Sequence, residues 1–127
     1  DFFARMQQGE SLSNTPLFWV GLLLFVVGLI STIFHDDVLS RLRPVPSAEY
    51  KIPSAGLFRF SSNAHYFSEI LEWFGFLLLT SSLPALLHFS AVTLLMLPQA
   101  QKTHRWYKDY FEDAYPTNRK ALIPFIF

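Results

Sequence analysis

Hydrophobic residues along this chain gather in two long runs, with polar segments before, between and after them. The first run, Pro16 to Phe34, contains nineteen residues and no charge. As an α-helix it would reach about 28 Å, close to the ~30 Å hydrocarbon core of a bilayer. Thr15 can cap such a helix, and Pro16 suits the first helical position. Because the run is apolar on every side, it predicts a membrane-spanning helix rather than a buried core helix.

The second run, from Tyr66 to Leu97, is too long for one ordinary span. Small polar residues and a proline interrupt it at Thr80-Ser81-Ser82-Leu83-Pro84, which is typical of a turn. We therefore expect two helices, at about 66–81 and 84–98, joined as a tight hairpin. The alternative is one long helix that is kinked at Pro84.

The polar segments complete the predicted fold. A loop from His35 to Ala64 contains three prolines and Gly56, so it is not one long helix. An amphipathic stretch from Gln99 to Ala114 follows the hairpin, and a tail from Tyr115 to Phe127 ends the chain. The predicted fold class is all-α: residues 1–127 form one integral membrane helical bundle with three transmembrane helices.

Basic residues are distributed unevenly across this arrangement. With three spans, the loop and the tail lie on the same side and carry four and five of the ten Lys and Arg residues, while only Arg5 lies opposite. The positive-inside rule places that side in the cytoplasm. A single kinked helix would put the loop and the tail on opposite sides and remove the bias, so the charge pattern favours the hairpin.

Composition constrains the class of protein and the kinds of site in three ways. Charged residues make up 16% of the chain, below the roughly 25% of a soluble domain. Ten acids balance ten bases, so no net positive charge indicates a nucleic-acid partner. The chain has no cysteine, which excludes disulfides and thiolate metal sites. Because it begins at Asp1, without Met, we interpret it as an excerpt or processed piece of a longer protein, and no signal peptide is recognisable.

A polar stripe at the start of the second run is the first candidate site. His65, Glu69 and Glu72 fall on one face of the predicted helix, and no Asp, Glu, Lys or Arg follows from Trp73 to Gln101. A carboxylate at the edge of hydrocarbon usually faces a polar cavity or a cation. The stripe lacks an HExxH motif or a visible third partner, so we predict no metal.

Basic residues alternate with aromatic residues in the loop and the tail. Arg43 precedes Tyr50-Lys51, His104-Arg105 precedes Trp106-Tyr107, and Arg119-Lys120 follows Tyr115. This combination suits an anionic, aromatic ligand, because guanidinium pairs with phosphate and rings pack on rings. The alternatives are a juxtamembrane loop that meets lipid phosphates and an interfacial helix with an aromatic belt. Spacing alone does not decide between them.

Four short motifs, taken in order, narrow these alternatives. They are Tyr50-Lys51-Ile52-Pro53-x-x-Gly56-Leu57-Phe58, Tyr66-x-x-Glu69-Ile70-x-Glu72-Trp73-x-Gly75, His104-x-Trp106-Tyr107 and Tyr115-Pro116-x-x-Arg119-Lys120-Ala121-Leu122-Ile123-Pro124-Phe125. Together, from about residue 31 to 127, they resemble the C-terminal half of the steroid 5α-reductases. The resemblance implies a multi-span enzyme of the endoplasmic reticulum membrane that uses NADPH to reduce a carbon–carbon double bond conjugated to a carbonyl. It also implies that this half supplies most of a cofactor pocket open to the cytosol.

The resemblance also assigns residues by position. The predicted cofactor-binding residues are Asp37, Arg43, Tyr50, His65, Glu69, His104, Tyr107 and Arg119. This chain departs from the family where His65 replaces Asn and Ser68 replaces Gly. The groups that polarise the substrate carbonyl belong to the N-terminal half of the same protein, so this piece alone is expected to be inactive.

Four functions remain open at this point. The leading one is reduction of a 3-oxo-Δ4 steroid or a similar lipid enone, with membrane lipid as the other partner. The tails of very-long-chain enoyl-CoA reductases and polyprenol reductases are similar, and either activity is an alternative. A non-catalytic membrane scaffold with the same fold is the third alternative, because a scaffold need not keep the carbonyl-polarising groups.

Overall fold

The computed structural model describes residues 15–127, and every regular element in that range is helical. The elements are α2 (Pro16–Leu42), the 3-10 helix η2 (Gly56–Arg59), α3 (Ala64–Thr80), α4 (Leu83–Phe111) and the 3-10 helix η3 (Glu112–Ala114). The all-α prediction is confirmed for this part of the chain. Arg5, which the charge argument placed on the opposite side of the membrane, lies outside the described residues.

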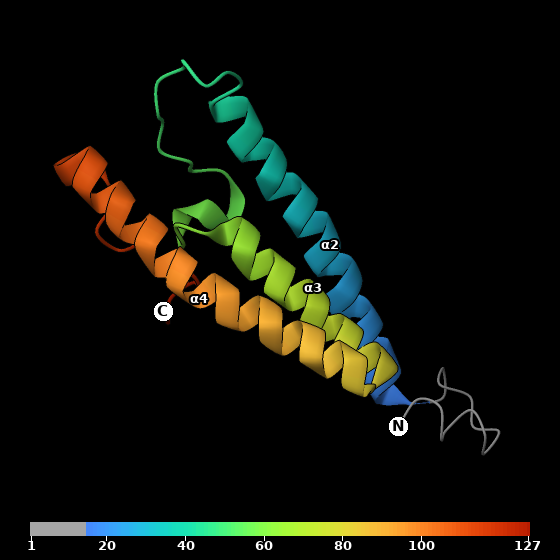
Figure 1. The fold of residues 1–127 in the computed structure, drawn as a ribbon. Coiled ribbons are helices and arrows are strands. Elements are labelled where there is room, and N and C mark those ends of the chain that lie inside the picture. Colours follow the sequence, from blue (N-terminus) through green and yellow to red (C-terminus); the bar gives the residue numbers. More distant parts are fainter. Residues whose placement is uncertain (1–14) are drawn as a thin grey trace.

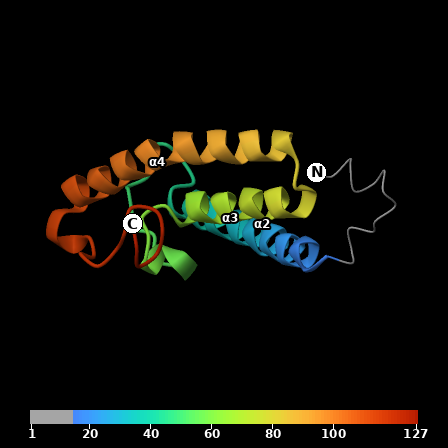
Figure 2. The same cartoon turned by 90° about the horizontal axis from the view of Figure 1, so that it is seen from below.

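Helix α3 lies between α2 and α4, and the three helices run side by side (Figures 1 and 2). Glycines allow α2 and α3 to approach closely. A Cβ atom added at Gly28 would lie 2.4 Å from the backbone nitrogen of Glu72, and one added at Gly75 would lie 2.3 Å from that of Phe25. Small residues at a contact let helix backbones approach in this way, as they commonly do in membranes.

Helix α2 starts as predicted but ends later. The side chain of Thr15 accepts a hydrogen bond from the backbone nitrogen of Phe18 at 3.4 Å, which caps the first turn. The expected end at Phe34 is wrong, because the helix continues for eight residues to Leu42. No proline or glycine interrupts those residues. The helix ends at Leu42 because Pro44 disfavours a helical conformation at the residue before it, Arg43.

The hairpin between α3 and α4 is confirmed, and the single kinked helix is wrong. Helix α3 ends at Thr80, and Ser81 adopts a left-handed conformation with φ of 48°. The Ser82 hydroxyl then accepts a hydrogen bond from the backbone nitrogen of Ala85 at 3.3 Å and caps α4. Pro84 lies in the first turn of α4, where its missing N–H costs nothing.

Helix α4 is one continuous helix of 29 residues, so the expected end at 98 is wrong. Pro98 lies inside it and removes one backbone hydrogen bond. The following residues contain no glycine or proline, and their aromatic rings stack one turn apart. Trp106 lies on Tyr110 at 5.0 Å, and Tyr107 lies on Phe111 at 6.1 Å between ring centroids. These contacts support the helix beyond the proline.

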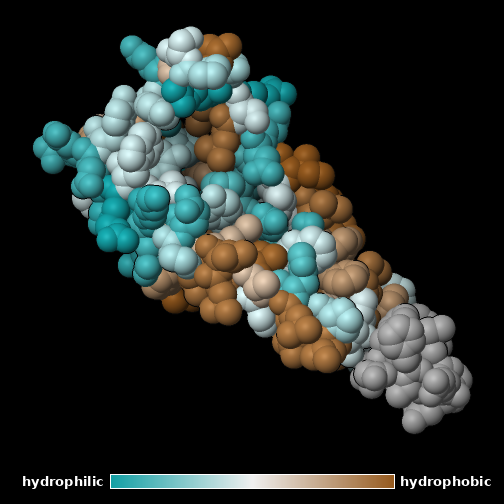
Figure 3. Space-filling view, in the orientation of Figure 1, coloured by the Kyte–Doolittle hydropathy of each residue, from teal (hydrophilic) through white to brown (hydrophobic). Residues whose placement is uncertain are grey.

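Within residues 15–127, two segments, Pro16–Leu42 and Leu83–Ala114, each contain an apolar stretch long enough to cross a membrane. Apolar side chains cover the end of the bundle where the three helices meet, and polar ones gather at the other end (Figure 3). Many large apolar residues on these helices are exposed, including Leu23, Leu87 and Leu95. This surface suggests a membrane protein. Helix α3 has 17 residues and spans only about 26 Å.

Candidate functional site

The loop after α2 and the tail after η3 meet at the polar end of the bundle. Arg119 is 6% exposed, and its Nη1 donates to the carbonyl oxygen of Pro53 at 2.5 Å. Its Nη2 donates to the Ser54 hydroxyl at 3.1 Å. The guanidinium therefore joins two segments that are separated by more than sixty residues.

Hydrogen bonds fix the tail beside the segment between η2 and α3. The backbone nitrogen of Ser62 donates to the carbonyl oxygen of Lys120 at 2.8 Å, and that of Lys120 donates to Phe60 at 2.9 Å. The Ser61 hydroxyl donates to the carbonyl oxygen of Leu122 at 2.6 Å. These hydrogen bonds thus fix the tail in place at the polar end of the bundle.

A cavity of about 160 Å³, here called the aromatic cavity, lies between the end of α2, the loop and α4. Three predicted site residues line it: Arg43, Tyr50 and Tyr107. The guanidinium carbon of Arg43 lies 3.8 Å from the centre of the Tyr50 ring, and that ring meets Trp106 at 4.9 Å. Its other lining residues are Leu39, Leu42, Lys51 and Trp106.

Arg43 is also a structural residue of the loop. Its Nε donates to the carbonyl oxygen of Ala48 at 3.0 Å, and its Nη2 donates to that of Pro46. These hydrogen bonds within the chain hold the guanidinium in place over the Tyr50 ring. A cation fixed over an aromatic ring can bind a ligand that combines negative charge with a flat ring.

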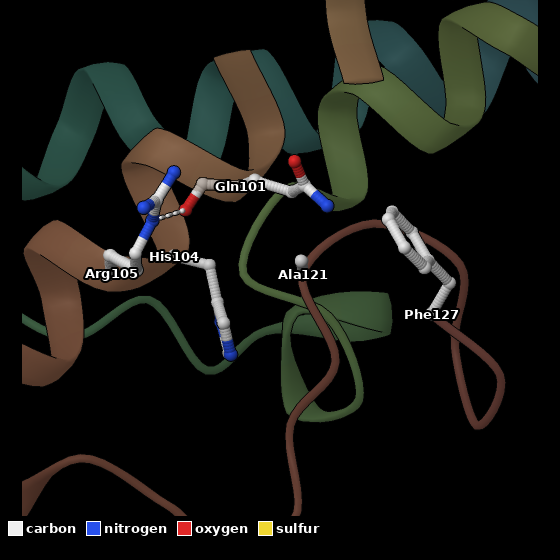
Figure 4. A pocket seen from close by; sticks show the side chains of 5 residues that line it. All are labelled: Gln101, His104, Arg105, Ala121 and Phe127. Atoms are coloured by element: carbon white, nitrogen blue, oxygen red, sulfur yellow. Dashed lines mark hydrogen bonds between the residues drawn. The ribbon is translucent and has the colours of Figure 1, made fainter. Parts of the chain in front are cut away.

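A second cavity of about 390 Å³, here called the tail cavity, lies between α4 and the tail. Gln101, His104 and Arg105 line it from α4, and Ala121 and Phe127 line it from the tail (Figure 4). His104 is the one predicted site residue in this lining. The Arg105 Nε donates to the carbonyl oxygen of Gln101 at 3.5 Å within α4.

Two buried residues connect His104 to the tail. The Ser62 hydroxyl lies 2.5 Å from Nδ1 of His104 and 2.5 Å from the hydroxyl of Tyr115. Tyr115 stacks on Tyr107, with 5.2 Å between ring centroids and 8° between ring planes. Arg119 lies over the ring of Tyr115 as well, with its guanidinium carbon 5.2 Å from the ring centre.

Two groups here have shifted pKa values, and both lie beyond Leu97, where the apolar run ends. Burial lowers the pKa of His104, and the charges of Lys108 and Lys120 add to the effect. Burial raises the pKa of Tyr107 to about 12. At neutral pH the site therefore favours a neutral imidazole and a protonated phenol.

The polar stripe of α3 lies apart from both cavity linings. His65 packs between the rings of Phe58, at 5.9 Å, and Tyr66, at 4.1 Å. Its Nδ1 is buried and has no hydrogen-bond partner within residues 15–127. Glu69 is half-buried and Glu72 is buried, and neither accepts a hydrogen bond within that range. Across the same residues, no three His, Cys, Asp or Glu side chains are placed to hold a metal.

Asp37 is not gathered into either cavity. Its carboxylate pairs with Arg41 at 2.9 Å on the exposed face of α2, where an ion pair adds little stability. The structure thus brings Arg43, Tyr50 and Tyr107 together and connects them through Tyr115 to Arg119 and His104. It leaves Asp37, His65 and Glu69 outside these contacts.

Three buried polar residues near this site, namely His35, Ser62 and Tyr115, are not among the predicted cofactor-binding residues. His35 is 3% exposed, and its Nε2 accepts a hydrogen bond from the backbone nitrogen of Leu57 at 3.0 Å. Its Nδ1 therefore carries the proton and donates to the carbonyl oxygen of Ser31 at 2.7 Å. Tyr115 opens one of the four motifs and His35 lies two residues before Asp37, a predicted site residue, and these positions are signals. Nothing in the sequence around Ser62 indicates its contacts.

Comparison with known proteins identifies the family. The model of the 3-oxo-5-alpha-steroid 4-dehydrogenase family matches residues 1–127. A steroid 5-alpha-reductase of Gossypium hirsutum is 41% identical over 122 residues, which cover 93% of this chain and 47% of that protein. The 3-oxo-5-alpha-steroid 4-dehydrogenase 1 of Rattus norvegicus is 44% identical over 118 residues, covering 92% and 45%. The 3-oxo-5-alpha-steroid 4-dehydrogenase 2 of Homo sapiens is 46% identical over 111 residues, covering 87% and 43%.

By their names, these relatives are oxidoreductases that act on CH–CH groups. The chain spans less than half the length of each of them. The family model covers the loop, the hairpin and the tail that build the two cavities. The resemblance inferred from the four motifs is confirmed, and the chain belongs to the 3-oxo-5-alpha-steroid 4-dehydrogenase family.

Proposed function

We propose that the full-length protein is an NADPH-dependent membrane reductase that acts on a carbon–carbon double bond conjugated to a carbonyl, as in a 3-oxo-Δ4 steroid. The names of the relatives support the reaction and the steroid. The observation that carries the cofactor is the aromatic cavity, where Arg43 lies over Tyr50 and Tyr107 forms part of the wall. Cations beside aromatic rings suit a ligand with phosphates and flat heterocycles.

Buried atoms without hydrogen-bond partners are a second observation that fits such a cofactor. Four buried side-chain atoms have no hydrogen-bond partner within residues 15–127, and two of them belong to predicted cofactor residues. These two are Nδ1 of His65 and Nε of Arg119. Buried polar atoms without a partner are uncommon, and a ligand is one of the groups that satisfies them.

Each residue of the proposed site has a role that its chemistry allows. Arg43 and Arg119 hold positive charge near phosphate, and both are already fixed by backbone carbonyls. Tyr50 and Tyr107 offer ring faces, and Glu69 accepts hydrogen bonds from an amide, a ribose or an arginine. Bound NADPH would supply the hydride for the β carbon of the enone. The groups that polarise the carbonyl are proposed to lie in the N-terminal half.

The proposed setting is the endoplasmic reticulum membrane, with three spans in this part of the chain and the loop and tail in the cytosol. The bond from Arg119 to Pro53 supports this, because two segments in contact must lie on the same side of a bilayer. Nine of the ten Lys and Arg residues lie in two segments of the chain, four within residues 35–65 and five within residues 99–127. Helix α3 is short. To cross the membrane it would need a locally thinner bilayer or shielding by the neighbouring helices.

The experiment that tests the function is a reductase assay of the full-length protein in detergent or liposomes. NADPH is supplied with a 3-oxo-Δ4 steroid, an enoyl-CoA or a polyprenol, and products are identified by mass. We expect reduction of the steroid double bond and little turnover of the other two substrates. Preferred turnover of the enoyl-CoA or the polyprenol would replace the proposed substrate, and no turnover of any of them by folded protein would favour the scaffold.

A further inference from the structure

We propose that Ser62 and Tyr115 are positioning residues that hold His104 in the tautomer whose proton is on Nε2, so that the imidazole presents an N–H donor to the tail cavity. The inference about the tautomer rests on geometry within this chain. The identity of the ligand that would accept from Nε2 rests on the proposed function.

The tautomer of His104 follows from where the protons of Tyr115 and Ser62 lie. Tyr115 is 2% exposed, and within residues 15–127 its hydroxyl has one hydrogen-bond partner, the hydroxyl of Ser62. A buried phenol that fails to donate its proton loses free energy, so Tyr115 donates and Ser62 accepts. Ser62 is 1% exposed and has one proton of its own, which it donates to its other partner, Nδ1 of His104. Nδ1 is then an acceptor, and the ring proton is on Nε2.

The opposite direction is less favourable. If Nδ1 of His104 donated to Ser62, the Ser62 oxygen could also accept from Tyr115, but the Ser62 proton would then have no acceptor within the described part of the chain. If Ser62 donated to Tyr115 instead, the Tyr115 proton would have none. The lowered pKa of His104 agrees with a neutral ring that carries a single proton.

The consequence concerns the kind of group that the tail cavity can bind. His104 lines that cavity together with Gln101 and Arg105 (Figure 4). An Nε2–H in a cavity that an arginine and an amide also line favours an oxygen that accepts hydrogen bonds, such as that of a phosphate or a carboxamide. In the proposed reductase these are the polar groups of NADPH.

The test measures the tautomer directly in the full-length protein. Histidine labelled with ¹⁵N is incorporated, and the His104 signals are identified by their loss in His104→Gln. We expect an unprotonated Nδ1 and a protonated Nε2 in the unmodified protein. Tyr115→Phe, which keeps the ring stacked on Tyr107, should give a mixture of both tautomers, and Ser62→Ala should do the same.

The control is Tyr110→Phe, because Tyr110 is exposed and its hydroxyl has no hydrogen bond within residues 15–127. That variant should leave the His104 signals unchanged. A proton on Nδ1 of His104 in the unmodified protein would overturn the inference, as would unchanged signals in Tyr115→Phe. If Ser62→Ala fails to fold, Tyr115→Phe still decides.

A second readout separates this inference from the proposed function. The dissociation constant for NADPH should rise about fivefold in Ser62→Ala and in Tyr115→Phe, as for partial loss of one neutral hydrogen bond. If NADPH fails to bind the unmodified protein, the proposed function is wrong. The NMR experiment still determines which nitrogen of His104 carries the proton. If NADPH binds and the tautomer does not respond to either variant, the inference about Ser62 and Tyr115 is wrong.

Discussion

The Nη1 atom of Arg119 lies 2.5 Å from the carbonyl oxygen of Pro53 and donates a hydrogen bond to it. The same side chain donates to Ser54 and lies against the ring of Tyr115. One buried guanidinium therefore holds the tail, the loop and the aromatic cluster of α4 in a single arrangement. The cofactor role inferred for Arg119 depends on this structural role, because the charge is fixed in position by the contacts that join the segments.

Replacement of Arg119 by alanine should therefore destabilise the protein as well as weaken cofactor binding. Loss of hydrogen bonds from a buried charged group costs about 1.5–3 kcal/mol, and the dissociation constant for NADPH should rise roughly tenfold. The measurements are the melting temperature of the full-length protein in detergent and NADPH binding at a temperature where the variant is folded. Arg59→Ala is the control, because Arg59 is exposed and forms no hydrogen bond or ion pair within residues 15–127.

An unchanged melting temperature in Arg119→Ala would contradict the structural role. Normal NADPH binding by a destabilised but folded variant would remove Arg119 from the cofactor site and leave the structural role intact. The two roles can therefore be judged separately.

The loop and the tail should be accessible from the same side of the membrane. The chain has no cysteine, so single cysteines can be introduced at Ser47 and Thr117, which are both exposed. In sealed microsomes an impermeant thiol reagent added from the cytosolic side should label both. Labelling of one position from the cytosol and of the other only after permeabilisation would overturn the arrangement of the spans.

Lowering the pH should destabilise the folded protein partly through His104. Burial lowers the pKa of His104 in the folded state below the ordinary value of about 6.5. As the pH falls through 6.5, the unfolded state binds a proton on this residue before the folded state does, so stability decreases. Melting temperatures measured from pH 7.5 to 5.5 should fall less steeply in His104→Gln than in the unmodified protein. Identical slopes would show that His104 contributes nothing to the pH dependence.

Glu69 should matter for cofactor binding, whereas Glu72 should not. Glu69→Gln keeps the size of the side chain and removes its charge, so the dissociation constant for NADPH should rise roughly tenfold. Glu72→Gln is the matched control one turn further along α3, where the residue is buried and its backbone lies against Gly28. Binding by isothermal titration to the full-length protein measures both. Equal effects of the two variants, or none in Glu69→Gln, would reject the assignment.

Local sequence signals predicted the helices and the hairpin well, because each of those features depends on neighbouring residues. Thr15 and Ser82 cap helices through backbone groups three residues away, and Pro84 starts a helix. The two wrong helix ends have local causes as well. The charged residues after Phe34 are compatible with a helix as well as with a loop, and the aromatic contacts that follow Pro98 outweigh its helix-breaking tendency.

The site was only partly predictable, for a different reason. The motifs indicated which residues matter, and the cavity that contains Arg43, Tyr50 and Tyr107 agrees with them. The contacts of Ser62 join residues 42 and 53 positions apart, and no local pattern encodes such pairs. Their partners follow from how the tail folds back on the start of α3, which only the structure describes.

The central claim is that the cations and rings of this part of the chain form the pocket for NADPH. Its most direct test is equilibrium binding of NADPH and of NADH to the purified full-length protein, without substrate. The account predicts that NADPH binds at least about tenfold more tightly, since the extra phosphate gains a charge-assisted contact. Equal affinities for the two cofactors, or binding of neither by folded protein, would contradict it.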